Sequence, residues 1–361
     1  MTDASPRMIL TAGDRVVIAA AIVLPVTAGL TRYLAAGSIL AFVAALLAVG
    51  VLAALVGRCV EQLAERLGSG ATGVLQSALG NLPELFIGVF ALRAGLVTVV
   101  QAAIVGSVLA NVLLVLGASF VVGGQRHGVQ RFSSQRARSL TALMMTAVAA
   151  MLVPSLASYV RTPASAHESV LSSVTAVVLL IVFALSVPSS LRRTAAEKPP
   201  PPEPEERPRW PVGFAVSLLA VTGALAAVVS SWFVDALAPA IVTLHISQAF
   251  AGLVIVAIAG NAVENVAGIQ LAARNRPDHA LSVILNSPLQ ISLVLAPVLV
   301  LASHVVGGAV LTLVFPPLLV TTLVAAVLVV AMIINDGEST WLEGAALIGL
   351  YIVVATAFWW G

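Results

Sequence analysis

The sequence predicts an all-α polytopic membrane protein with eleven transmembrane helices, arranged as two inverted five-helix repeats plus one extra N-terminal helix. Three observations lead to this fold class. Of the 361 residues, 60% are hydrophobic and 9% are charged, whereas a soluble domain has about 25% charged residues. The apolar runs are continuous and do not alternate with the period of two that is typical of membrane barrels. A short acidic motif also occurs twice in the chain.

Each transmembrane helix is predicted from one long apolar stretch. A helix that crosses a bilayer needs about 20 mostly apolar residues. Charged residues, proline clusters and glycines divide the chain into eleven such stretches. No cleavage site stands out after the first one, which is therefore interpreted as an uncleaved span. The predicted spans are residues 15–34, 37–57, 72–92, 97–124, 139–159, 168–187, 211–234, 248–272, 279–304, 308–334 and 341–360.

A segment rich in proline and charge separates the apolar stretches into two sets. It contains the run PPPPEPEERPRWP, a composition typical of a linker. Four regions are therefore predicted. They are the N-terminus with the extra helix (1–36), the first repeat (37–187), a cytoplasmic linker (188–210) and the second repeat (211–361).

Positive charges are distributed unevenly between the two sides that the spans define. With eleven spans, 15 of the 18 Lys and Arg residues fall on the side of the N-terminus. Cytoplasmic loops are enriched in Lys and Arg, so we expect the N-terminus in the cytoplasm and the C-terminus outside. The basic residues thus indicate topology and contact with the lipid bilayer, and no nucleic-acid partner is expected. An integral multi-pass protein of a prokaryotic plasma membrane fits this pattern.

The repeated motif marks the two halves of the chain. Residues 80–88 read GNLPELFIG and residues 260–268 read GNAVENVAG. Ser107 and Ser287 each follow the glutamate of their motif by 23 residues. Because five spans lie in each repeat, the second copy is inserted upside down. Secondary transporters have such inverted repeats, with the binding site near the bilayer midplane.

Only two of the 16 acidic residues, Glu84 and Glu264, lie well inside predicted spans. An ionised carboxylate at that depth costs several kcal/mol and normally faces a partner, a cavity or an ion. A protonated glutamate with one interhelical hydrogen bond is the structural alternative. Two glutamates at equivalent repeat positions favour a functional site over that alternative.

The polar residues that accompany the glutamates are oxygen ligands. Asn81 and Asn261 precede the glutamates by three residues, on the same helix face. Hard cations such as Ca²⁺ take about 6–8 oxygens, whereas Zn²⁺ and Cu⁺ prefer Cys, His or Met. Two carboxylates neutralise one divalent cation. In its absence they repel one another and take up protons, so cation and protons compete for one site.

Glycine and proline interrupt the helices at the motif. Gly80, Pro83 and Gly260 weaken the backbone hydrogen bonds there. A local break frees carbonyl oxygens for a cation, and lipid tolerates such a break only where the backbone lines a cavity. Close helix packing at small residues is the alternative explanation.

Residues 80–124 and 260–293 resemble the two α-repeats of the cation/proton exchangers in the Ca²⁺:cation antiporter superfamily. The resemblance implies a secondary transporter that exchanges cytoplasmic Ca²⁺ for protons by alternating access, with the repeat glutamates as shared Ca²⁺ and proton sites. Gln101 matches a position at which the family often has a glutamine, and the resemblance therefore places it near the site. The ligands that the resemblance implies are Glu84, Gly80, Asn81, Ser107, Asn111, Glu264, Gly260, Asn261, Ser287 and Gln290.

The sequence departs from the family pattern in ways that leave the choice of ion open. Pro83 replaces a small residue, and Asn265 stands where a histidine often follows the second glutamate. A Na⁺ or K⁺/H⁺ antiporter on the same fold is the nearest alternative function, and a cation channel is a more distant one. No P-loop, HExxH or GxSxG motif is present, so no enzyme activity is expected. Apart from the transported Ca²⁺ and H⁺, no cofactor is expected.

Overall fold

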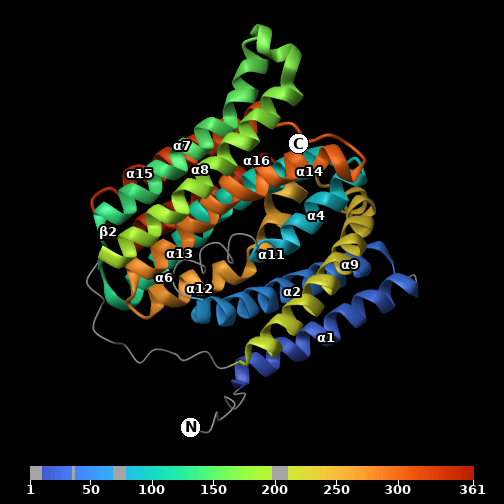
Figure 1. Ribbon diagram of the computed structural model, residues 1–361, viewed down its shortest axis with the longest axis horizontal. Coiled ribbons are helices and arrows are strands. Elements are labelled where there is room, and N and C mark those ends of the chain that lie inside the picture. Colours follow the sequence, from blue (N-terminus) through green and yellow to red (C-terminus); the bar gives the residue numbers. More distant parts are fainter. Residues whose placement is uncertain (1–9, 35–36, 68–78, 197–209) are drawn as a thin grey trace. The chain divides into compact units, whose positions relative to one another are not determined.

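The computed structural model describes residues 10–34, 37–67, 79–196 and 210–361, and these are mostly helical (Figure 1). Side chains are described for the same ranges except 64–67, 187–196 and 262–264. The chain divides into two compact units. The first unit comprises Met1–Phe90 and Ile181–Thr243, and the second comprises Ala91–Leu180 and Leu244–Gly361.

The first unit is built on three long helices, α1 (Ala12–Tyr33), α2 (Ser38–Leu67) and α9 (Val212–Leu244). A capping box starts α1, because the Thr11 hydroxyl accepts a hydrogen bond from the Asp14 N–H and the Asp14 carboxylate accepts one from the Thr11 N–H. The unit also contains most of α4 (Leu82–Arg93) and the end of α8 (Glu168–Ala196).

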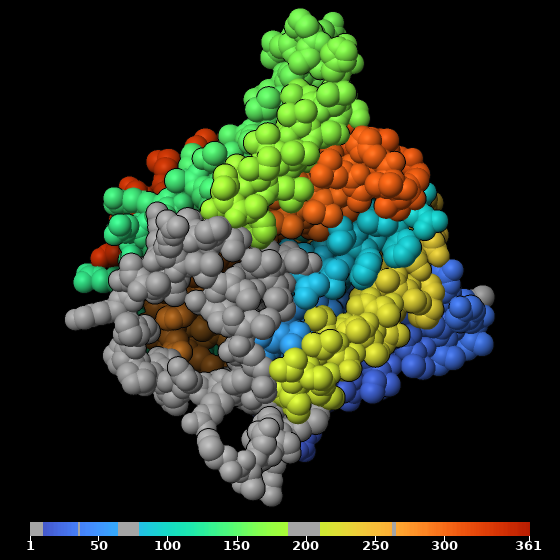
Figure 2. Space-filling model, viewed as in Figure 1, coloured from blue at the N-terminus to red at the C-terminus, as the bar shows by residue number. Residues whose placement is uncertain are grey.

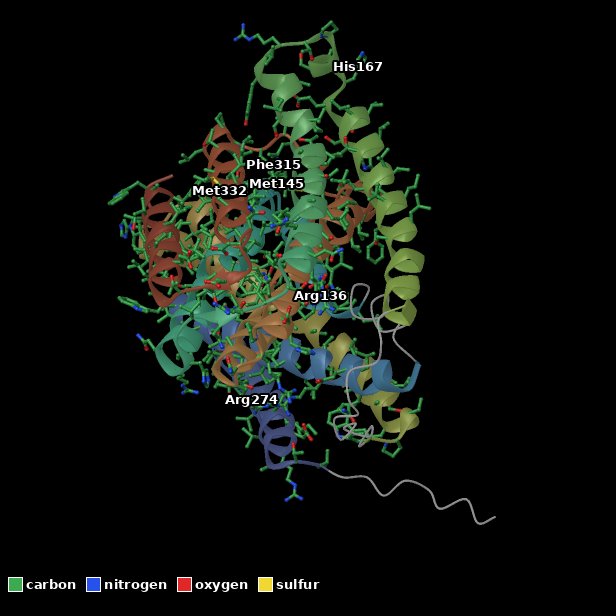
Figure 3. The ribbon with its side chains drawn as sticks, turned by 90° about the vertical axis from the view of Figure 1, so that its left-hand side faces the viewer. Arg136, Met145, His167, Arg274, Phe315 and Met332 are labelled. Carbon is green, nitrogen blue, oxygen red and sulfur yellow. The ribbon has the colours of Figure 1, made fainter. Side chains whose placement is uncertain are left out.

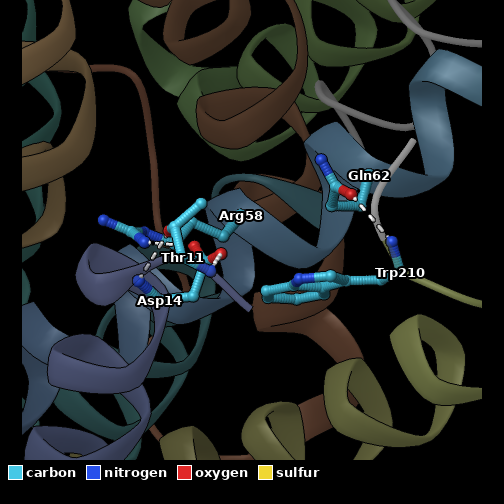
Figure 4. Close-up of polar contacts among 5 residues, drawn as sticks. All are labelled: Thr11, Asp14, Arg58, Gln62 and Trp210. Atoms are coloured by element: carbon cyan, nitrogen blue, oxygen red, sulfur yellow. Dashed lines mark hydrogen bonds and ion pairs between the residues drawn. The ribbon is translucent and has the colours of Figure 1, made fainter. Parts of the chain in front are cut away.

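Polar contacts link these helices near their ends. Arg58 of α2 pairs with Asp14 of α1 at 2.5 Å, and the Trp210 N–H, just before α9, donates to Gln62 Oε1 at 3.2 Å (Figure 4). At another place in the unit, Arg32 pairs with Asp235 at 2.8 Å. The first unit therefore ties α1, α2 and α9 together by charge and hydrogen bonds as well as by apolar packing.

The second unit is centred on two long interrupted helices. The first runs through α5 (Val97–Leu109), the π-helical turn η1 (Ala110–Val115) and α6 (Leu116–His127). The second runs through α13 (Pro277–Gln290), the π-helical turn η4 (Ile291–Leu295) and α14 (Ala296–Val306). The segment α10 (Gln248–Phe250), η3 (Ala251–Val256), α11 (Ala257–Gly260) and α12 (Ala262–Ala273) packs beside them.

The remaining helices of this unit surround that centre. They are α7 (Ser134–Tyr159), the 3₁₀ turn η2 (Pro163–His167), the start of α8, α15 (Pro317–Ile333) and α16 (Trp341–Ala357). The tip of the α7–η2–α8 hairpin projects from the rest of the unit (Figure 2). Two short strands, β1 (Gln130–Arg131) and β2 (Glu338–Ser339), pair antiparallel, with Gln130 opposite Ser339.

Helix boundaries repeat at nearly the same offset in the two halves of the chain. Helices α4 and α12 have 12 residues each, and each begins directly after the asparagine of its motif, Asn81 or Asn261. The π-helical turns η1 and η4 likewise follow the two motif serines. The sequence repeat is thus accompanied by a repeat of local structure.

All eleven predicted spans overlap described helices, but several boundaries differ. Among the described residues, seven helices are long and apolar enough to cross a membrane, or eight if the pair bent by 61° around residue 261 counts as one span. Residues 58–67, which lie beyond the predicted second span, continue α2, and residues 188–196 of the predicted linker continue α8. The rest of that linker, up to residue 209, lies outside the described residues.

The predicted span 308–334 is helical only from Pro317 onward. Residues 307–316, called the strap below, are non-helical although they are apolar. Gly307 and Gly308, with φ of 78° and 100°, end α14 in a backbone conformation that favours glycine. A Cβ at Gly308 would also lie 2.6 Å from the carbonyl oxygen of Leu92. The hydropathy of the strap reflects burial inside the second unit, where Leu311, Leu313 and Phe315 are at most 1% exposed.

Candidate cation site

Four predicted ligands meet in the second unit around Asn261. The Asn261 Nδ2 donates to Ser107 Oγ at 3.0 Å. The Asn261 Oδ1 accepts from Ser287 Oγ at 3.0 Å and from Asn111 Nδ2 at 3.1 Å. All four side chains are at most 4% exposed. The polar cluster, as we call these four residues, therefore joins both motif serines and one motif asparagine in a buried network.

A break in the helix places Asn261 at the centre of the polar cluster. Helix α11 ends at Gly260, and Asn261, with φ of −91° and ψ of 20°, separates it from α12. The Asn261 Nδ2 also donates to the Ala257 carbonyl at 2.9 Å. A second amide uses the same local contact, since Asn111 Nδ2 donates to the Ser107 carbonyl at 2.9 Å. These bonds to the preceding turn fix the orientation of both amides.

Glycine brings the helix that carries Ser107 close to the segment that precedes Asn261. A Cβ at Gly106 would lie 2.3 Å from the carbonyl oxygen of Leu253, and a Cβ at Gly252 would lie 2.3 Å from that of Val99. Real Cβ atoms do not approach so closely, so only glycine fits at these two positions. The backbones of α5 and η3 therefore touch one residue away from Ser107.

One oxygen of the polar cluster has no hydrogen-bond partner among the described residues. It is Asn111 Oδ1, on a side chain that is 0% exposed. Leaving a buried acceptor unpaired costs about 1–3 kcal/mol. An oxygen in that condition is suited to a hard cation, which binds amide, hydroxyl and carboxylate oxygens together.

The first motif belongs to the other unit. Gly80 lies in the turn before α4, and Glu84 lies in the first turn of that helix, where the helix dipole favours a carboxylate. Asn81 and Glu84 are 6% and 7% exposed, and Asn81 Nδ2 has no hydrogen-bond partner among the described residues. Both side chains are thus buried.

The second glutamate is only partly described. The backbone of Glu264 lies in the first turn of α12, and its side chain lies outside the described residues. Gln290, partly buried, ends α13. The participation of all ten predicted ligands in binding an ion, those of the polar cluster included, stays a prediction.

Gln101 lies in α5 and contacts the strap. Its Nε2 donates to the carbonyl oxygens of Thr312 at 3.1 Å and Val314 at 2.9 Å. Three serines that sequence reasoning did not single out, Ser155, Ser172 and Ser303, also bond the strap. The sequence shows these serines only as single hydroxyl residues within apolar helices. Such serines are common in membrane helices, so they do not by themselves indicate a contact with the strap.

Histidine, cysteine and acidic side chains form no metal-binding group of three or more among the described residues. His127 and His304 instead contact the backbone oxygens of Ala273 and Val300. Cys59 is buried in α2. The polar cluster is therefore a set of neutral oxygen and nitrogen groups, to which the motif glutamates are the predicted source of charge.

Comparison with protein families gives one extended match. The model for a family described as sodium/calcium exchanger protein matches residues 37–191 and 214–360. A Ca(2+)/H(+) antiporter of Aphanothece halophytica is 34% identical over 336 residues, covering 88% of this chain and 89% of the relative. The Ca(2+)/H(+) antiporter ChaA of Bacillus subtilis is 35% identical over 310 residues, covering 85% and 88%.

Solved structures show the same similarity. Native YfkE has a TM-score of 0.81 and 30% sequence identity, over 96% of this chain and 99% of that one. An H⁺/Ca²⁺ exchanger CAX has a TM-score of 0.74 over 96% and 92%, and at 14% identity it supports the fold alone.

Proposed function

The chain belongs to the sodium/calcium exchanger family, and on that basis we propose that it exchanges cytoplasmic Ca²⁺ for protons across the membrane. The relatives named above are Ca²⁺/H⁺ antiporters and match most of the chain. The observation that carries the proposal is the polar cluster. Ser107, Asn111, Asn261 and Ser287 come from both sequence repeats and meet in one buried network.

In the proposed mechanism, Glu84 and Glu264 bind Ca²⁺ and protons alternately. Two carboxylates neutralise one Ca²⁺, and the amides and hydroxyls of the polar cluster supply neutral oxygens. Without the cation, repulsion between the carboxylates favours protonation. Only the neutralised states cross between the inward-open and outward-open forms, because an unpaired charge in a dry interior is costly. Binding of one substrate therefore requires release of the other.

The proposed architecture has eleven spans, with the five-span repeats inserted in opposite orientations. The matching bounds of α4 and α12 and the π-helical turns η1 and η4 support two related halves. Within the second unit, Arg136 and Arg274 lie toward one end and His167 toward the other (Figure 3). This separation agrees with a cytoplasmic side rich in arginine.

Everted membrane vesicles with an acidic interior test the function. Addition of Ca²⁺ should dissipate the pH gradient when the protein is present and should leave it unchanged in vesicles that lack the protein. Na⁺ and K⁺ are added in separate experiments. A response to these monovalent ions and none to Ca²⁺ would assign the chain to monovalent cation exchange instead.

A cation channel is separated from an exchanger by the same preparation. An exchanger gives flux that saturates with Ca²⁺ concentration and moves protons in the opposite direction. Flux that rises linearly with concentration and continues without counter-movement of protons would rule out exchange.

A further inference from the structure

The strap, residues 307–316, has its backbone polar groups bonded by side chains of the surrounding helices. Non-helical backbone at membrane depth is tolerated only where the protein satisfies its hydrogen bonds. Seven N–H and C=O groups between Leu311 and Phe315 have side-chain partners. The five side chains that supply these partners are Gln101, Ser155, Tyr159, Ser172 and Ser303.

The serine partners bond neighbouring backbone groups of the strap, at Leu313 and Phe315. Ser155 Oγ donates to the Leu313 carbonyl at 2.8 Å and accepts from the Phe315 N–H at 2.9 Å. Ser172 Oγ accepts from the Leu313 N–H at 3.0 Å. Both polar backbone groups of Leu313 are thus bonded by serines of two different helices, α7 and α8.

Gln101 is the partner that comes from α5. Its Nε2 serves two carbonyls two residues apart, those of Thr312 and Val314. A side-chain amide has two N–H donors, so its nitrogen can serve both carbonyls. An ionised glutamate at this position would have no hydrogen-bond donor for the two carbonyl oxygens. A leucine would leave both carbonyls without a partner.

Helix α5 also carries the polar cluster. Ser107 lies six residues after Gln101, and Asn111 follows in η1. At Gly106 the helix touches the backbone of Leu253 so closely that no side chain fits between them. The helix is therefore held at two levels, by the strap at Gln101 and by η3 at Gly106.

We propose that Gln101 is a positioning residue for ion exchange, which sets the rotation of α5 through the strap and does not itself bind the ion. The resemblance to cation/proton exchangers places a glutamine at this position among the site residues. The hydrogen bonds of Gln101 direct its amide nitrogen to the strap instead. The inference rests on the proposed function, because it concerns how Ser107 and Asn111 are aligned for Ca²⁺.

The experiment compares Gln101→Leu with the matched variant Ser303→Ala. Ser303 Oγ bonds the Leu311 N–H from α14, so its loss releases the strap without releasing α5. Each change is made in Cys59→Ser protein, with and without Leu313→Cys. Leu313 is 0% exposed, so a thiol there reacts with a water-soluble maleimide only when the strap opens. KM and kcat for Ca²⁺ are measured in proteoliposomes of the proteins without the added cysteine.

We expect both variants to speed labelling of the thiol, and only Gln101→Leu to raise the KM for Ca²⁺, by about tenfold. Gln101→Glu, of the same size, should behave like Gln101→Leu. Gln101→Asn keeps the amide on a side chain one methylene shorter, which draws its N–H donors back from the Thr312 and Val314 carbonyls, and it takes the place of Gln101→Leu if that protein does not fold.

Three results would overturn the proposal. Loss of Ca²⁺ binding with unchanged labelling would make Gln101 a ligand. Faster labelling with unchanged KM would make it purely structural. A rise in KM in Ser303→Ala equal to that in Gln101→Leu would show that the strap affects Ca²⁺ exchange without α5. If the parent protein does not exchange Ca²⁺, the proposed function fails and this role fails with it, but labelling still reports whether Gln101 holds the strap.

Discussion

Asn261 joins three segments of chain through one amide. It bonds Ser107 in α5, Asn111 in η1 and Ser287 in α13. Asn261 therefore makes three hydrogen bonds within the polar cluster, whereas Ser287 contributes one hydroxyl to it. Substitutions of these two residues should therefore differ in their effect on stability.

Asn261→Leu should lower the free energy of unfolding by about 1–3 kcal/mol, because it leaves buried hydroxyls without partners. Ser287→Ala should cost less, since it removes one of the bonds to Asn261 and leaves the others. Thermal unfolding of the purified proteins checks the order. A larger loss for Ser287→Ala would contradict the central position of Asn261.

Glu84→Gln and Glu264→Gln should each abolish exchange and leave the protein folded. Glutamine keeps the shape and one oxygen but removes the charge and the exchangeable proton. A buried carboxylate costs folding energy, so both variants should unfold at or above the temperature of the parent. Ca²⁺ should raise the unfolding temperature of the parent only.

The matched control for these variants is Glu338→Gln, at a partly exposed acid that pairs with Arg131. It should exchange Ca²⁺ at the parental rate. Near-parental flux in either Glu84→Gln or Glu264→Gln, measured in the same liposomes, would mean that the ion binds elsewhere.

Apparent Ca²⁺ affinity should fall as the medium becomes more acidic, because protons and Ca²⁺ compete for the same carboxylates. At high pH the carboxylates are ionised and the affinity should reach a plateau. Equilibrium binding of ⁴⁵Ca²⁺ at a series of pH values measures this directly. An affinity that stays constant from acidic to alkaline pH is incompatible with a shared site.

At the scale of elements, the contact between α5 and η3 depends on the absence of two side chains. Gly106→Ala should destabilise the protein by about 1–3 kcal/mol, because the new methyl group would meet the backbone of Leu253. Gly349→Ala in α16 is the matched control, since nothing lies within 4 Å of its added Cβ. Its unfolding temperature should equal or exceed that of the parent.

The strap shows where sequence-based prediction of elements stops. Hydropathy assigns residues 308–316 to a span, because it measures burial and does not distinguish a helix facing lipid from irregular backbone enclosed by protein. Gly307, Gly308, Pro316 and Pro317 carry the information on the break. Their effect depends on hydrogen-bond partners more than 100 residues away, such as Ser155, which the sequence alone does not reveal.

The motif, in contrast, could be interpreted locally. Gly80 and Gly260 predict weak points in their helices; Gly80 lies in the turn before α4, and α11 ends at Gly260. The meeting of Ser107, Asn261 and Ser287 follows from spacing and the repeat. The contact of Gln101 with the strap could not be predicted, since an amide at membrane depth serves a backbone or an ion equally well.

At the scale of the whole molecule, the prediction to test is the membrane topology, which places Arg136 on the cytoplasmic side and His167 outside. The thiol of Arg136→Cys should react with a membrane-impermeant reagent only from the cytoplasmic side, and that of His167→Cys only from outside. Both residues are exposed, and the native Cys59 is replaced by serine beforehand. Labelling of both positions from one side would contradict the predicted orientation of the spans.

The strap also bears on the order in which the chain is assembled in the membrane. A short irregular segment with seven polar backbone groups to satisfy is a poor substrate for direct transfer into lipid. All five side chains that bond it, from Gln101 to Ser303, precede it in the chain. During synthesis from the N-terminus, every partner has therefore left the ribosome before the strap does. The strap is therefore synthesised after every side chain that bonds it, and its backbone groups have partners as soon as it folds against them.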